Sequence, residues 1–188
     1  MTKRKLNWAK KYAPQNWIYE TNNDNTARFV LGTDGKNPLV CFGINPSTAC
    51  PSSPDSTLIR VEKYAYCHGF DSWIMLNIYP QRATEPKNLH KVLDKDLHGE
   101  NIVWIEKILM RQQLQIWAAW GDAISSRKYL QKCLDDIEII INKYNSSLMK
   151  LELTTKGNPC HPLCRREGFS LYSTSLTAYS ENKIELYT

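Results

Sequence analysis

The sequence contains no long apolar run. None approaches the roughly 18 residues that a membrane-spanning helix requires, and no apolar signal-peptide core follows the basic residues 1–12. Internal repeats, low-complexity tracts and interdomain linkers are also missing. We therefore expect a cytoplasmic protein without a membrane partner. It should fold as a single domain over residues 1–188, with residues 1–25 as a peripheral basic segment.

The six cysteines lack the spacing of a metal site or a disulfide framework. There is no CxxC pair, and no cysteine falls in a short disulfide-dense module. Cys160 and Cys164 flank His161, so an iron–sulfur or zinc site is conceivable, but reduced structural thiols fit the missing CxxC spacing better. We predict no metal and no cofactor.

The composition that remains is that of an ordinary globular protein. Hydrophobic residues make up 42% and charged residues 23% of the chain, which argues against a disordered tail protein. Lys and Arg number 24 against 19 Asp and Glu, a balance that permits nucleic-acid binding without requiring it. Six Trp, ten Tyr and four Phe exceed what a minimal core needs, so some aromatic side chains are available to face a ligand.

Short apolar runs alternate with stretches of helical periodicity. Asp55 is predicted to cap a helix that ends near Gly69, and Asp122 to cap a later one. This alternation predicts an α/β fold, with three α/β/α layers around a central, mostly parallel four-stranded sheet. The predicted strands are residues 38–44, 72–77, 114–120 and 148–154.

In parallel sheets, ligands bind outside the carboxyl ends of the strands. We therefore expect the ends of the four predicted strands to form one crevice. The segments concerned are residues 43–48, 77–80, 120–122 and 154–163.

Two asparagines stand at these strand ends. Pro46 restrains Asn45, whose amide can orient water but cannot act as a general base. The alternative for Asn45 is an Asx-turn. Asn77 follows four apolar residues, and its amide can bind the donor–acceptor edge of a nucleobase. The alternative for Asn77 is an amide satisfied by the backbone of a neighbouring loop.

The last two strand ends carry Asp122 and His161. A helix N-terminus at Asp122 favours phosphate, but we interpret Asp122 as the cap of that helix. His161 directly precedes Pro162, and a restrained imidazole can donate to charge developing on a leaving group. The alternative is an ordinary surface histidine. Asp55 adds a carboxylate if it faces the crevice.

Taken in order, residues 39–46, 73–77, 116–121 and the His161-Pro162 pair resemble the four motifs of the uracil-DNA glycosylase superfamily. Gly43-Ile44-Asn45-Pro46 is similar to the mismatch-specific branch, which carries Asn in place of Asp. The fuller pattern is similar to a bacterial and phage family of unknown function, numbered 1643, across residues 28–165. Its hallmark segments here are residues 43–49, Asp55 with Thr57, and residues 77–79, 82–84, 118–121 and 157–163.

The resemblance implies a glycosylase-like fold and a role for each matching residue. Asn45 would position the attacking water, Asn77 would bind the base edge and His161 would stabilise the oxygen of the departing base. Further substrate contacts are expected from Gly43, Ile44, Pro46, Ser47, Thr48, Tyr79, Arg82 and Trp120.

Two positions bear on the substrate. Ser47 occupies the place of a bulky Tyr in the uracil-specific branch, which implies room for larger bases. Arg165 occupies the place of the apolar wedge that holds a flipped base out of duplex DNA. Since extruding a base costs a few kcal/mol, duplex DNA becomes a doubtful partner. A nucleobase, a nucleotide or a single-stranded nucleic acid fits better.

These observations predict an enzyme that recognises a nucleobase and cleaves or processes its N-glycosidic bond. The first alternative is a non-catalytic module that binds a nucleotide or modified base in the same crevice. The second is a phage or bacterial interaction protein with an exposed apolar patch on its outer helices. Candidate patch residues are Trp8, Trp17 and Trp104, although each is also suited to core or edge packing.

Overall fold

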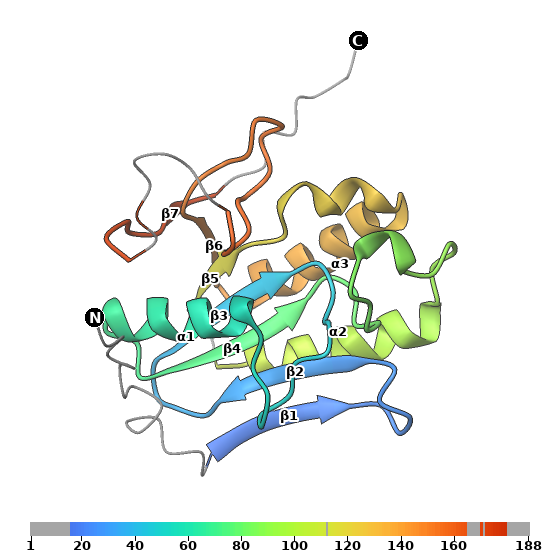
Figure 1. Cartoon of the computed structure of the whole chain (residues 1–188), viewed down its shortest axis with the longest axis horizontal. Coiled ribbons are helices and arrows are strands. Elements are labelled where there is room, and N and C mark those ends of the chain that lie inside the picture. Colours follow the sequence, from blue (N-terminus) through green and yellow to red (C-terminus); the bar gives the residue numbers. More distant parts are fainter. Residues whose placement is uncertain (1–15, 112, 165–169, 171, 180–188) are drawn as a thin grey trace, which may run out of the picture.

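The chain is built on one seven-stranded mixed sheet (Figure 1). The computed structural model describes residues 16–111, 113–164, 170 and 172–179. The strand order is β1-β2-β4-β3-β5-β6-β7. The strands are β1 Trp17–Thr21, β2 Arg28–Thr33, β3 Pro38–Gly43, β4 Ser72–Asn77, β5 Gln115–Ala118, β6 Ser147–Lys150 and β7 Thr177–Ala178.

The predicted four-stranded, mostly parallel glycosylase-like sheet is therefore wrong, although the α/β class is correct. β4, β3, β5 and β6 are successive parallel neighbours, but β1–β2, β2–β4 and β6–β7 pair antiparallel. β1 and β2 are joined by a short turn in which Asn25 has a φ of 57°. A hairpin needs no crossover helix. The strand–helix alternation used for prediction therefore could not reveal these strands.

Helices cover both faces of the sheet (Figure 1). α1 (Ser56–Cys67) packs on β3 and β4, whereas α2 (Lys95–Leu109) and α3 (Tyr129–Lys143) pack together on the other face. A separate apolar cluster fills the space on each side. Within the described part of the chain, no helix combines the length and apolarity needed to cross a membrane.

The predicted helix caps had different outcomes. Asp55 is the N-cap of α1, and its Oδ1 accepts from the backbone N–H of Leu58 at 2.9 Å, as predicted. The cap predicted at Asp122 is wrong. Asp122 lies inside the 3-10 helix η4 (Gly121–Ser126), which has no side-chain cap, and α3 begins only at Tyr129.

Candidate functional site

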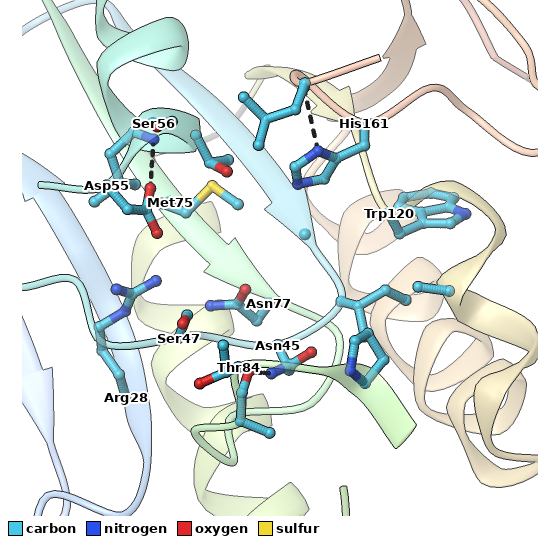
Figure 2. Close-up of a pocket in the computed structure, with 18 residues that line it drawn as sticks. Arg28, Asn45, Ser47, Asp55, Ser56, Met75, Asn77, Thr84, Trp120 and His161 are labelled. Atoms are coloured by element: carbon cyan, nitrogen blue, oxygen red, sulfur yellow. Dashed lines mark hydrogen bonds between the residues drawn. The ribbon is translucent and has the colours of Figure 1, made fainter. Parts of the chain in front are cut away.

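A cavity of about 390 Å³ lies at the carboxyl ends of β3, β4 and β5 (Figure 2). Its volume is within the range of about 300–1,000 Å³ found for small-molecule sites. All four segments selected from the sequence contribute to it, as expected from the parallel pairing of β3, β4, β5 and β6. The predicted site residues that line it are Gly43, Ile44, Asn45, Ser47, Asn77, Trp120 and His161.

Asn77 forms part of the cavity wall and is fully buried. Neither Nδ2 nor Oδ1 of its side chain has a hydrogen-bond partner among the described residues. A Cβ at Gly43 would lie 3.2 Å from Asn77 Oδ1 and 2.7 Å from Met75 Cε. Because Gly43 has no side chain, there is space beside the amide oxygen of Asn77. The methyl group of Met75 borders this space.

The backbone of Asn77 is held from the opposite face of the sheet. Asn101 of α2 is fully buried, and its Nδ2 donates to the carbonyl oxygens of Asn77 at 3.0 Å and Ile78 at 3.4 Å. Asn77 is the last residue of β4, and Ile78 directly follows the strand. Asn101 thus fixes the end of β4 from which the Asn77 side chain projects.

Asn45 is held by its own amide nitrogen. Nδ2 donates to the carbonyl oxygens of Pro46 at 3.0 Å and Ala83 at 2.7 Å. Both amide hydrogens are therefore used, and Oδ1 remains as the acceptor that Asn45 can offer to water or a ligand. Asn45 lines the cavity, and the bonds of its side chain run through Nδ2 rather than through the Oδ1 acceptor of an Asx-turn.

His161 enters the cavity from the loop after β6, and Figure 2 shows its ring on the opposite side of Asn77 from Arg28. Its Nδ1 accepts from the backbone N–H of Leu163 at 3.2 Å. Burial lowers the pKa of His161 below its ordinary value of 6.5, and the effect of nearby Asp55 opposes that shift. The imidazole is therefore neutral at pH 7, with its proton on Nε2 available as a donor.

A network of hydrogen bonds positions the His161 loop. Asp122 Oδ1 accepts from Thr154 Oγ1 at 2.6 Å and from Asn158 Nδ2 at 2.8 Å. These two bonds lower the pKa of Asp122. The backbone N–H of Gly121 donates to Pro159 O at 2.8 Å. The end of β5 is thus tied directly to the turn that precedes His161, which explains why Asp122 is not free to cap a helix.

Arg28 is a cavity residue that the sequence patterns did not reveal. Its side chain is 3% exposed, Nη1 donates to Ala49 O at 3.1 Å, and Nε has no partner among the described residues. Burial, followed by the positive charge of Arg82, lowers the pKa of Arg28 to about 10, and Asp55 opposes this shift. Arg28 therefore remains a cation at neutral pH, and it forms no ion pair with any described residue.

Asp55 supplies the carboxylate among the cavity-lining residues. It caps α1 and faces the cavity at the same time, which joins the two roles considered from the sequence. Across the described residues, no group of three or more His, Cys, Asp or Glu side chains is arranged to hold a metal ion. The cavity therefore combines one cation, one anion, two amides and a neutral imidazole.

Four predicted contact residues do not line this cavity. Tyr79 is buried, and its hydroxyl lies 2.9 Å from His90 Nδ1. Arg82 donates to the carbonyl oxygens of Ser47 and Ala49, to Asn25 Oδ1 and to Tyr19 Oη. Pro46 serves as a hydrogen-bond acceptor for the loop. Thr48 and Arg82 line a smaller neighbouring hollow, and Arg165 lies outside the described residues.

One family model matches the chain over residues 28–163, and its description is "Protein of unknown function (DUF1643)". The chain belongs to the DUF1643 family. Among curated proteins and solved structures, none matches it.

The DUF1643 match contains the complete cavity. Arg28 is the first matched residue and Leu163 the last, and both are in the cavity wall. β1 and β7, the two edge strands of the sheet, lie outside the match. The matched region is therefore the part of this DUF1643 protein that builds the site.

Proposed function

We propose that this DUF1643 protein recognises a nucleobase in the cavity and hydrolyses the N-glycosidic bond between that base and its sugar. The observation that carries the proposal is the fully buried Asn77 amide, whose two polar atoms have no partner among the described residues. An unsatisfied buried polar group costs about 1–3 kcal/mol. Such a group is expected where a ligand completes its hydrogen bonds, and the adjacent C=O and N–H of a base are complementary to an amide.

Access to Asn77 requires a small rearrangement of Met75. The Met75 methyl group borders the space beside Asn77 Oδ1 and contributes to the cavity wall. Methionine is unbranched and has three rotatable side-chain bonds, so it adapts readily to a neighbouring group. A planar base can therefore displace the methyl group and take its place between Met75 and the amide.

His161 and Asp55 suit the charges that develop during glycosidic cleavage. When the bond breaks, its electron pair leaves with the base and positive charge grows on the sugar. Nε2–H of His161 can donate to an oxygen of the departing base. The Asp55 carboxylate favours the positive sugar. Water completes the reaction by adding its oxygen to C1′, and the proton that it releases neutralises the base anion through the solvent, which leaves the free base and the sugar hydroxyl.

In this proposal Asn45 Oδ1 accepts a hydrogen bond from the attacking water; the use of both Nδ2 hydrogens on Pro46 O and Ala83 O supports that role. An amide does not take up the proton of that water. General-base catalysis typically contributes about 10²–10⁴ in rate. We therefore expect slow turnover, favoured by bases that leave easily.

The lack of a general base at Asn45 supports a second candidate function, a non-catalytic module that binds a nucleotide or modified base. Asn45 does not titrate, and Oδ1 of Asp55 is engaged in capping α1. A cavity without a strong general base is sufficient for binding. This candidate predicts tight ligand binding with no release of base.

Incubation with DNA, RNA and nucleotides that carry normal, deaminated or modified bases tests the proposal. Free base is measured by mass spectrometry. Wild-type protein should release a base, whereas an Asn45→Ala, His161→Ala double variant should not. Asn142→Ala, a change at an exposed position of α3, is the matched control and should retain activity.

Two results would count against hydrolysis. If folded wild-type protein releases no base from any substrate but binds one of them, the binding module is the correct function. If the double variant releases base as fast as the wild type, neither Asn45 nor His161 has the proposed role.

A further inference from the structure

The guanidinium of Arg28 and the amide of Asn77 both line the cavity, and both residues are buried. Figure 2 shows both side chains extending into the same space, with the amide nitrogen of Asn77 on the side of Arg28. The amide oxygen lies on the other side, close to Gly43. Along this wall the order of groups is guanidinium donor, amide donor and amide acceptor.

The charges in the cavity favour a neutral ligand over a phosphate at this end. Arg28 and Asp55 are the two charged side chains in the cavity wall, and His161 is neutral at pH 7. A phosphate placed against Arg28 would bring its negative charges toward Asp55. A neutral oxygen or ring nitrogen accepts from the guanidinium without that repulsion.

We propose that the cavity selects a 6-oxopurine base, with Arg28 donating to N7 and O6 while Asn77 donates to O6 and accepts from N1–H. The proposal rests on the nucleobase-binding function inferred above and specifies the class of base. N7, O6 and N1–H present two acceptors followed by a donor, which complements the wall group by group. Arginine pairs with the same N7 and O6 atoms when proteins contact guanine.

Other bases leave at least one of these groups unmatched. Adenine presents an amino group in place of O6, so its donors face the donors of Arg28 and Asn77. Uracil matches the Asn77 amide but offers only C–H at its position 5, where Arg28 needs an acceptor. The short side chain of Ser47 and the cavity volume of about 390 Å³ leave room for the second ring of a purine.

Calorimetric titration of the full chain with four free compounds tests this selection. The probes are hypoxanthine, 7-deazahypoxanthine, adenine and uracil. Hypoxanthine should bind most tightly. Replacing N7 by C–H in 7-deazahypoxanthine should weaken binding about ten- to a hundredfold, as expected for a lost hydrogen bond to a charged group.

Variants at position 28 assign this effect to one side chain. Arg28→Met should bind hypoxanthine and 7-deazahypoxanthine equally. Arg28→Lys keeps the positive charge but loses the planar guanidinium, and it should reduce the difference between the two compounds while preserving the fold. Arg82→Lys is the matched control, because Arg82 also donates to Ala49 O but does not line this cavity. It should behave like the wild type.

The outcomes separate this inference from the function on which it rests. Equal binding of hypoxanthine and 7-deazahypoxanthine by the wild type would overturn the role of Arg28, whether or not Arg28→Met folds. Tighter binding of adenine or uracil would overturn the 6-oxopurine preference but leave nucleobase recognition intact. If no base binds and none is released from any substrate, the proposed function fails and this inference fails with it.

Discussion

Replacing Asn77 by leucine should stabilise the protein and abolish ligand binding. Asn77 is fully buried, and neither amide atom has a partner among the described residues. Removing such an unsatisfied group relieves about 1–3 kcal/mol. For a chain of this size, each kcal/mol corresponds to about 2–4 °C. The melting temperature should therefore rise by about 2–12 °C, with the adjoining cavity accommodating the slightly bulkier leucine, which has the same branched shape.

Asn101→Leu is the matched control. Asn101 is equally buried, but its Nδ2 donates to the carbonyl oxygens of Asn77 and Ile78. Its Oδ1 has no partner among the described residues, so leucine removes one unsatisfied acceptor but leaves two buried carbonyls without their donor. The net effect should be a destabilisation of about 1–3 kcal/mol. The two asparagine-to-leucine changes are thus expected to have opposite signs.

The assays are thermal unfolding by calorimetry and urea unfolding, each repeated in the presence of a bound base. Wild-type protein should gain stability from the base, whereas Asn77→Leu should gain none. If Asn77→Leu is less stable than wild type by 1 kcal/mol or more, the amide is already satisfied in the free protein. The argument for a ligand-binding role of Asn77 would then be refuted.

Three further changes probe the cavity. Gly43→Ala should weaken base binding about tenfold, a loss of about 1.4 kcal/mol, because the new methyl group would lie 3.2 Å from Asn77 Oδ1. Unchanged affinity by calorimetry would contradict this. Asp55→Ala should cost about 0.5–2 kcal/mol of unfolding free energy through loss of the α1 cap, whereas Asp55→Asn should cost much less; equal losses would exclude capping as the cause. Because the pKa of His161 is lowered on folding, its contribution to stability is complete above pH 6.5 and is lost as the pH falls through the folded pKa. Urea unfolding of wild type and His161→Gln, repeated from pH 7 downward, should show this loss of unfolding free energy only in the wild type. Parallel curves of unfolding free energy against pH would contradict a contribution from His161.

The positions of Asn45, Asn77 and His161 in one cavity could be predicted because each lies at, or after, the carboxyl end of a parallel strand. Carboxyl ends of parallel strands meet at one edge of a sheet, so strand order alone brings such residues together. Their hydrogen bonds could not be predicted. That Asn45 uses its amide hydrogens on Pro46 and Ala83 depends on how two loops meet.

The place of Arg28 in the cavity could not be predicted from the strand ends. It begins β2, which runs antiparallel to β4, and therefore reaches the cavity from the amino-terminal end of a strand. A search restricted to carboxyl ends omits it. Arg82 shows the opposite case. Its sequence setting suggested a substrate contact, and the structure shows that its guanidinium donates to the backbone of Ser47 and Ala49 outside this cavity.

The pairing of β6 with β7 has a consequence for the entropy of ligand binding. Lys150 and Thr177 are partners in this pairing, so the segment that carries His161 is a loop closed at both ends by the sheet. Closing a loop restricts the chain when the protein folds. Within this loop, the Leu163 N–H donates to the imidazole and Pro159 accepts from Gly121, so His161 is held before a ligand arrives and binding does not have to immobilise it. More of the interaction energy then remains available to hold the ligand itself.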